Sequence, residues 1–311
     1  MVRLYTFMPS KPEVILGTLP MLALTTAMLL WSSAFISLKY LLTYLHPTQI
    51  VFFRMLLASC CFLLSFKQLK AFQYQKGDWI WLMIMGIAEP CLYFLFETSA
   101  LKYTTAGQAG MITATLPLLV SIAAYFILKE KISRFQILGF FVAIAGCILL
   151  SVCAEAEEQA SNPLLGNGLE FMAMICGTIY SIAIRRLSSR YSAWVLTSMQ
   201  AFIGTLFFGP LALSHELPTQ LGIQQWGSLI YLATLVTIGA YWLYNWSVSQ
   251  VEVSLAGAYI NLIPVFTLIL AFVLLNERIN SIQGFACVIV FAGVVLSQIQ
   301  PKKQQNIMVV S

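Results

Sequence analysis

The chain has 311 residues, of which 59% are hydrophobic and only 9% are charged. Because an ordinary soluble domain has roughly 25% charged residues, this composition excludes a soluble globular protein and indicates a membrane protein. The formal net charge of +5 is spread over several short polar loops, so it fits a membrane topology signal better than a surface for nucleic acid.

The apolar runs of the sequence predict membrane-spanning helices, because their lengths match the roughly 20 residues that a helix needs to cross the hydrocarbon core. The first run has no small-residue cleavage site after it, so we expect a retained helix and not a secretory signal. In chain order the runs predict an all-α polytopic protein with ten spans: residues 19–39, 48–66, 79–99, 106–128, 135–153, 166–185, 193–213, 227–248, 254–275 and 281–298.

One stretch of the chain occurs twice. Residues 105–150 align without a gap with residues 252–297, at an offset of 147 residues. Each copy has an apolar run with a proline, a short turn around Glu130 or Glu277, and a second apolar run that contains Ala-Gly. We expect the two glutamates to cap helices or to pair with loop arginines, and a role in gating is the alternative.

Lysine and arginine predict the orientation, because they stay preferentially on the cytoplasmic side. With the N-terminus inside, 13 of them fall in cytoplasmic segments, and only Lys39, Lys102 and Arg278 fall outside. Both termini are therefore expected in the cytoplasm, with the chain in the inner (plasma) membrane. The predicted organisation is a cytoplasmic segment (1–18), a first five-helix repeat (19–153), an acidic outer linker (154–165), a second five-helix repeat (166–298) and a cytoplasmic tail (299–311).

Five helices is an odd number, so the second half is expected to enter the membrane in the opposite orientation from the first. Inverted repeats of this kind build two halves that rock around a central site, which opens to one side of the membrane or the other. The alternative is a static helical scaffold, because duplication also produces such proteins.

Ionisable residues inside membrane spans usually face the bundle interior or a watery cavity. In the third span Glu89, Tyr93 and Glu97 recur at four-residue steps, so they share one helix face, which we call the span-three stripe. Glu89 is expected to bind a substrate ammonium group or a proton that drives transport. The alternative is a neutral carboxylic acid that is bonded to a neighbouring helix.

Other polar and proline residues in the spans have more than one interpretation. Arg54 and Glu97 are expected to form an ion pair, which is either an outer gate or a structural pair. Glu170 is expected to be an interfacial side chain that reaches the outer water. Helix kinks are predicted at Pro90, Pro117 and Pro264, because proline removes a backbone hydrogen bond.

Aromatic residues are expected to complete the cavity. Shifting Glu97 by 147 residues gives Tyr244, so the second half has aromatic rings where the first half has a carboxylate. Rings can hold a cationic substrate through cation–π contacts, and we expect Tyr241 and Tyr244 in the cavity and Trp246 at the interface. Asn261 could offer its amide to the substrate.

Several of these features occur together in a known family. They are the Trp31-Ser32-Ser33-Ala34-Phe35 segment, Arg54, and the helices of Pro117 and Pro264, each of which leads into a Leu-x-Glu-x-Ile turn. The chain resembles the drug/metabolite transporter (DMT) superfamily, in particular its EamA-type ten-helix members. The resemblance implies a central cavity formed by both halves, and export or exchange of small metabolites such as amino acids. It also places Trp31 and Phe35 on a cavity-lining helix, and helix packing is the alternative for this aromatic pair.

The sequence contains no G-x-x-x-x-G-K-[ST] phosphate loop, no H-E-x-x-H and no G-x-S-x-G, so an enzyme is not expected. With His46 and His215 as the two histidines, both in predicted outer loops, no metal site is expected. No cofactor is expected either, and an ion gradient, with the proton as a candidate, or a substrate gradient would supply the energy.

The predicted function is secondary active transport that exports or exchanges small amphipathic metabolites, with amino acids or their derivatives as expected substrates. The alternatives are efflux of lipophilic cations, uptake of a nucleotide-like metabolite, or a different class: a membrane scaffold or an intramembrane enzyme. The expected partners are a small-molecule substrate and the lipid bilayer, and no nucleic acid. A monomer and a homodimer are both left open.

Overall fold

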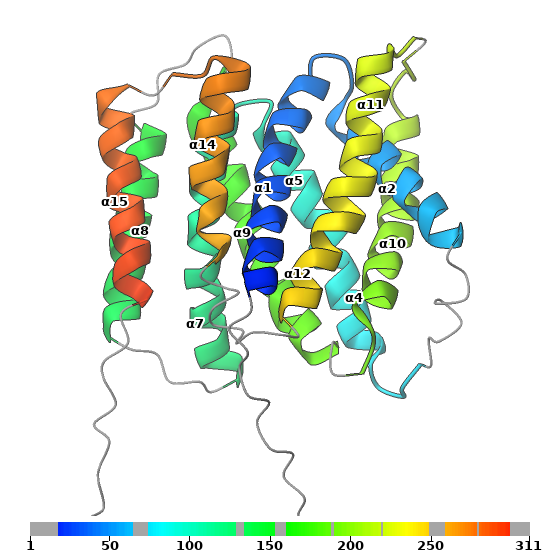
Figure 1. Ribbon diagram of the computed structural model, residues 1–311, viewed down its shortest axis with the longest axis horizontal. Helices are drawn as coiled ribbons and strands as arrows, with labels where there is room; N and C mark the ends of the chain where they lie inside the picture. The colour runs from blue at the N-terminus through cyan, green and yellow to red at the C-terminus, as the bar shows by residue number, and fades with distance from the viewer. Residues whose placement is uncertain are drawn as a thin grey trace, which may run out of the picture.

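The computed structural model describes residues 18–64, 74–128, 134–152, 160–187, 190–218, 220–248, 259–278 and 280–298. The regular elements within these ranges are helices that run side by side in one bundle (Figure 1). The first residue of α1 and the last residue of α15 lie at the same end of this bundle (Figure 1). Residues 1–17 of the predicted N-terminal segment, the predicted tail at 299–311, the first half of the predicted linker (154–159) and Glu130 are outside the described residues.

The helices begin and end close to the predicted spans. They are α1 (Thr18–Leu41), α2 (Pro47–Leu64), α4 (Trp79–Gly86), η1 (Ile87–Leu92), α5 (Tyr93–Ala100), α6 (Ala106–Ile112), η2 (Thr113–Thr115), α7 (Leu116–Leu128), α8 (Arg134–Val152), α9 (Pro163–Leu187), α10 (Ala193–Leu213), α11 (Ile223–Tyr231), η3 (Leu232–Ala240), α12 (Tyr241–Val248), α14 (Leu262–Leu275) and α15 (Ser281–Gln298).

Seven helices of the described residues are long and apolar enough to cross a membrane. Shorter apolar helices occupy the other predicted spans, at Ile137–Leu150, Leu262–Leu275 and Gly284–Gly293. The prediction of an all-helical polytopic membrane protein is therefore confirmed. Ten crossings and an inverted relation between the halves remain predictions.

Two of the long helices are interrupted by π-helical segments. The first is η1, which joins α4 to α5 and contains Pro90. Proline has no backbone N–H to continue the helix, and the residue before it favours an extended backbone, which Glu89 adopts at φ −146° and ψ 119°. The Glu89–Pro90 peptide bond is cis. The second segment, η3, joins α11 to α12, and in it the Thr237 hydroxyl donates to the Leu232 carbonyl at 2.8 Å.

The other two prolines of interest lie at helix starts. Pro117 is the second residue of α7, directly after the 3₁₀ turn η2. Pro264 lies in the first turn of α14. A proline in the first turn costs little, because the N–H that it lacks would have no partner within the helix there.

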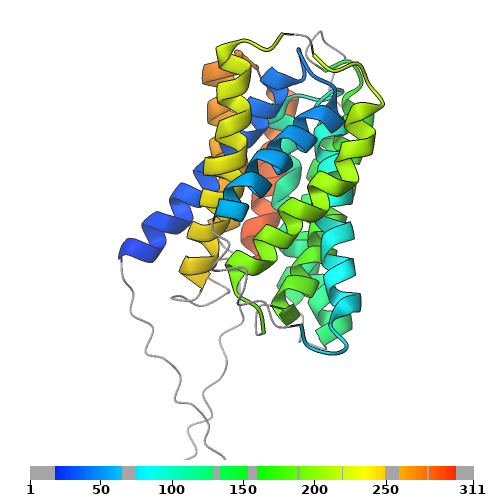
Figure 2. The same cartoon turned by 90° about the vertical axis from the view of Figure 1, so that its right-hand side faces the viewer.

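Small residues allow close packing at one edge of the bundle, where α8 and α15 lie side by side (Figure 1). A Cβ atom added to Gly293 of α15 would lie 2.5 Å from the backbone nitrogen of Ala143 on α8, which is the close approach that small residues permit between membrane helices. At the opposite edge α2 packs against α10 (Figure 2). The largest apolar core lies between these edges, among α1, α2, α11 and α14.

The turn after α14 holds the start of α6 by hydrogen bonds. Asn276 ends α14 in the left-handed conformation, with φ 54° and ψ 25°. Next to it, the buried Glu277 carboxylate accepts hydrogen bonds from the backbone N–H groups of Ala106 and Gly107, both at 2.8 Å. The prediction that this glutamate caps a helix is confirmed, and the capped helix is α6.

Candidate functional site

Glu89 lies where the two interrupted helices meet. Its side chain is buried, and the hydroxyl of Tyr241, the first residue of α12, donates a hydrogen bond to its carboxylate. The Gln200 amide of α10 donates to its backbone carbonyl at 3.4 Å, a carbonyl that borders the break in the helix. The break in the third span therefore presents a carboxylate to α12 and a backbone carbonyl to α10, both from the second half of the chain.

The span-three stripe continues from Glu89 along α5. The Tyr93 hydroxyl donates to the carboxylate of Glu97 at 3.1 Å, and Glu97 is buried. Tyr93 is half-buried, with its ring against Gly177 of α9. The stripe thus lies within the bundle, on the side of α5 that meets α9.

Arg54 is buried beside these carboxylates but binds a different group from the predicted one. Its Nε donates to the Thr237 hydroxyl of η3 at 2.7 Å, and its guanidinium carbon lies 4.5 Å from the centre of the Phe94 ring. It is close enough to Glu89 and Glu97 to interact electrostatically with both. The expected direct ion pair with Glu97 is not formed among the described residues, because the guanidinium is engaged by η3 and Phe94.

Three aromatic residues form a cluster beside Glu89. The Trp31 ring lies 5.3 Å from the ring of Tyr241 and 5.2 Å from that of Tyr244, measured between centroids. All three side chains are half-buried, and we refer to them as the aromatic cluster. The neighbouring Trp242 points elsewhere, because it is 55% exposed and stacks on Trp246.

The remaining predicted site residues lie apart from this group. Phe35 is 4% exposed and belongs to the largest apolar core, so the structure places it in helix packing and not with the aromatic cluster. Asn261 lies half-buried at the N-terminus of α14, next to the turn that contains Pro264. Near it, the Ser32 hydroxyl donates to the Ile263 carbonyl at 3.1 Å and connects α1 to α14.

Two segments of the chain, residues 18–152 and 164–298, match the sequence profile of the EamA-like transporter family. Together these segments cover most of the 311 residues. The chain belongs to this family.

Similar proteins agree with membership of the EamA-like family. A protein of Archaeoglobus fulgidus named "Uncharacterized transporter" is 28% identical over 279 residues, which are 89% of this chain and 96% of that protein. The "Uncharacterized inner membrane transporter YhbE" of Escherichia coli K12 is 29% identical over 266 residues, 80% of this chain and 78% of YhbE. A crystal structure with 20% identity shares the fold at a TM-score of 0.63, over 89% of this chain and 96% of that one. The chain is therefore a membrane transporter of the EamA type, and not an enzyme.

Sequence reasoning misplaced one carboxylate of this EamA-like transporter. Glu170, expected at the interface with outer water, is fully buried in α9, and neither of its carboxylate oxygens has a hydrogen-bond partner among the described residues. Its position in the second turn of a long helix suggested exposure, but α5 covers it.

Two further polar residues of the site were missed. Nothing in the local sequence of Gln200 indicates its bond to the Glu89 carbonyl. Thr237 does carry a signal, because it lies 147 residues after Pro90, at the same place in the repeat.

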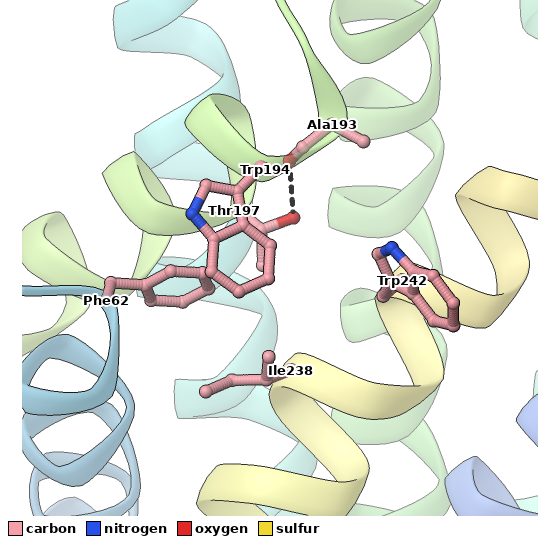
Figure 3. Close-up of a pocket in the computed structure, with 6 residues that line it drawn as sticks. All are labelled: Phe62, Ala193, Trp194, Thr197, Ile238 and Trp242. Atoms are coloured by element: carbon pink, nitrogen blue, oxygen red, sulfur yellow. Dashed lines mark hydrogen bonds between the residues drawn. The ribbon is translucent and has the colours of Figure 1, made fainter. Parts of the chain in front are cut away.

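A hollow of about 200 Å³, which includes its open mouth, lies between α2, α10 and the helix formed by η3 and α12 (Figure 3). Its walls are mainly apolar, and the Thr197 hydroxyl that lines it donates to the Ala193 carbonyl at 2.9 Å. The hollow shares no residue with the aromatic cluster or the span-three stripe. Its lining residues are Phe62, Ala193, Trp194, Thr197, Ile238 and Trp242.

Proposed function

We propose that this EamA-like transporter is a secondary active carrier that exports or exchanges small amphipathic metabolites with a cationic group, such as amino acids or their derivatives. The carrier works by alternating access between two inverted five-helix halves, residues 19–153 and 166–298, in ten crossings. The observation that supports this proposal best is the buried Glu89 carboxylate, held at a helix break by the Tyr241 hydroxyl of the other half.

The repeat supports a central site at this position. Shifting η1, residues 87–92, by 147 residues gives 234–239, which fall inside η3 (Leu232–Ala240). The two π-helical segments therefore occupy equivalent places in the two halves. Such segments interrupt helices frequently at functional sites, and this pair brings Glu89 from one half to Tyr241, the residue directly after η3, from the other.

The chemistry of the site favours a substrate with a positive charge and an apolar part. The Glu89 carboxylate would pair with an ammonium group in a low-dielectric interior, where an unpaired charge is costly. The aromatic cluster of Trp31, Tyr241 and Tyr244 would receive the rest of the molecule through apolar and cation–π contacts. A nucleotide fits less well, because Arg54 is the one buried basic side chain beside Glu89 in the described residues, and it already binds η3.

Counterflow into proteoliposomes tests the proposal. The proteoliposomes would be loaded with unlabelled amino acids, polyamines or nucleotides, and the uptake of each labelled compound would be compared between wild type and Glu89→Gln. A charge-assisted hydrogen bond contributes about 1.5–3 kcal/mol, so Glu89→Gln should weaken uptake of the cationic class by roughly 10-fold to 100-fold.

Two further variants make the result specific. Glu216→Gln changes an exposed glutamate in the same chemical way and should transport as wild type does. Tyr241→Phe keeps the carboxylate but removes its hydrogen bond, so it should weaken uptake less than Glu89→Gln. Nucleotide counterflow that is insensitive to Glu89→Gln would overturn the proposed substrate class, and counterflow of no compound by folded protein would overturn the carrier.

A further inference from the structure

Glu170 is a buried carboxylate that the proposed transport site does not use. It is 0% exposed, and it is the one buried charged side chain in the described residues whose polar atoms have no hydrogen-bond partner. An ionised carboxylate without a partner is very costly in an apolar interior, so such a group becomes neutral by binding a proton. The surroundings of Glu170 therefore indicate that its carboxyl group binds a proton.

Helix packing places Glu170 next to the span-three stripe. α5 and α9 run antiparallel, because Gly166 lies against Thr104 while Gly177 lies against Tyr93. In this register Glu170, one turn after Gly166, lies opposite the end of α5 that contains Glu97. Glu97 is also the group that acts on Glu170 electrostatically.

The two carboxyl groups of this pair have different surroundings. Burial disfavours the charged form of both groups, but for Glu97 the nearby positive charge of Arg54 and the hydrogen bond from Tyr93 act against this effect and favour its ionised form. Glu170 has neither. When two acids lie close together in unequal surroundings, one keeps the proton while the other stays charged. The proton is therefore expected on Glu170.

No other charge offsets Glu170. The helices packed against α9 are α4, η1, α5, α6, η2, α7 and α8, and the groups on them that interact electrostatically with Glu170 include Glu97 and Tyr93, neither of which carries a positive charge. The titratable or charged groups on these helices, and in the loop after α5, are Glu89, Cys91, Tyr93, Glu97, Lys102, Tyr103, Tyr125, Arg134 and Cys147.

A polar network lies between Glu170 and the end of the bundle where α9 begins. The Thr104 hydroxyl donates to the Asn167 side-chain oxygen at 2.7 Å, and the Asn167 amide donates to the Gln108 side-chain oxygen at 2.9 Å. Asn167 is one turn before Glu170 on α9. These three side chains place polar groups one turn from Glu170, toward the end of the bundle where α9 begins.

We propose that Glu170 and Glu97 form a proton-binding site that is separate from the substrate site at Glu89. Glu170 carries the proton, Glu97 remains charged, and the proton leaves a Glu170 oxygen for water when the site opens. A hard metal cation needs several oxygen ligands at once, whereas a proton needs a single carboxyl oxygen, so the lone Glu170 side chain fits a proton.

The proton site couples to transport, and this part of the inference rests on the proposed function. A cationic substrate at Glu89 stabilises negative charge on the neighbouring carboxylates, and therefore favours proton release from Glu170. Coupling of two binding equilibria is reciprocal, so a proton on Glu170 favours release of the substrate. This exchange of one proton for one cationic substrate is antiport.

Infrared spectroscopy of the purified full chain in nanodiscs tests the proton site without any substrate. The carbonyl stretch of protonated carboxylic acids would be recorded in H₂O and D₂O across neutral pH for wild type, Glu170→Gln, Glu97→Gln and Glu216→Gln. The band should lose the intensity of one carboxyl group in Glu170→Gln, and keep it in the exposed control Glu216→Gln. An unchanged band in Glu170→Gln would overturn the assignment.

The folding of these variants is informative in itself. Glutamine has nearly the shape of a protonated glutamate and is also neutral, so Glu170→Gln should fold and elute as wild type does. If it fails to fold while Glu97→Gln and Glu216→Gln fold, the neutral state assigned to Glu170 is contradicted.

Transport measurements then separate proton coupling from substrate transport. Glu170→Gln should retain counterflow of the cationic substrate but lose accumulation driven by a pH gradient, which for one proton reaches about tenfold per pH unit. If wild type shows no counterflow, the proposed function fails while the infrared result still decides the proton site. If Glu170→Gln keeps proton-driven accumulation, or if wild type requires Na⁺ in its place, the inference fails while the carrier stands.

Discussion

Replacing Glu277 by glutamine should destabilise the transporter, because this side chain holds the start of α6 from another part of the chain. The left-handed residue Asn276 turns the chain after α14, and the Glu277 carboxylate then accepts two backbone hydrogen bonds of 2.8 Å from Ala106 and Gly107. The side chain is 6% exposed, so water cannot replace these bonds in the variant.

The expected loss follows from this geometry. A glutamine at position 277 keeps one acceptor oxygen but turns its amide NH₂ toward the second backbone N–H, so one hydrogen bond is lost and one buried donor is left without a partner. A hydrogen bond to a charged group contributes about 1.5–3 kcal/mol, and a negative charge at a helix N-terminus adds about 0.3–1 kcal/mol. The free energy of unfolding should therefore fall by about 2–4 kcal/mol.

Reversible unfolding in mixed micelles, titrated with a denaturing detergent, would measure this loss against Glu216→Gln, the exposed control. The Glu277→Gln protein should still fold, because the Lys39 ammonium also holds the loop before α6, donating to the carbonyls of Leu101 at 2.7 Å and Thr104 at 2.6 Å. A loss no larger than that of the control would refute the reasoning, since it would mean that the two bonds are not formed in the protein.

Two further predictions use contacts elsewhere in the structure. Gly293→Ala should lower the free energy of unfolding by roughly 1–3 kcal/mol, because the added methyl group would lie 2.5 Å from the backbone nitrogen of Ala143. The control Gly284→Ala in the same helix meets nothing within 4 Å and should change stability by no more than about 1 kcal/mol; equal effects would refute the close packing of α8 and α15. Partial burial, and then the neighbouring His215 and Lys102, lower the pKa of His46 below its ordinary value of 6.5. The folded protein then binds fewer protons than the unfolded chain, so the contribution of His46 to the free energy of unfolding is complete above pH 6.5 and is lost as the pH falls through the lowered pKa. The free energy of unfolding, measured against pH, should therefore fall less on acidification in His46→Gln than in wild type. Equal pH dependence of the two proteins would contradict this prediction.

The helix ranges could be predicted from the sequence because hydrophobic length is a strong local signal. The predicted span at 106–128 and α6 to α7 share both ends, and the predicted range 281–298 is that of α15. The cap formed by Glu277 could be anticipated as well, because a repeated glutamate directly after an apolar run is well placed to reach a helix end. The helix ranges depend on residues that are close together in the chain, whereas the repeat does not show that the helix capped by Glu277 is α6, about 170 residues away.

The partners of the buried polar groups could not be predicted, because they come from helices far apart in the sequence. Arg54 was expected to pair with Glu97 on charge alone, but its Nε binds the neutral hydroxyl of Thr237. That hydroxyl is presented by η3, a π-helical segment that contains no proline to mark it. Similarly, the burial of Glu170 depends on the packing of α5 against α9, which no local pattern in either helix records.

In the proposed mechanism, the charge balance among the buried carboxylates connects substrate binding to proton binding. Glu89 at the helix break, Glu97 on α5 and Glu170 on α9 are buried, and Arg54 is the one buried basic side chain in the described residues, so full ionisation would leave two negative charges in excess in a region of low dielectric. Such an excess is strongly unfavourable, and it can be offset only by bound protons or by a cation from outside the protein. A cationic substrate at Glu89 and a proton at Glu170 would each offset one of these two charges, so each would reduce the electrostatic attraction for the other. In the proposed exchange, this mutual effect would couple the two sites without a separate signalling pathway.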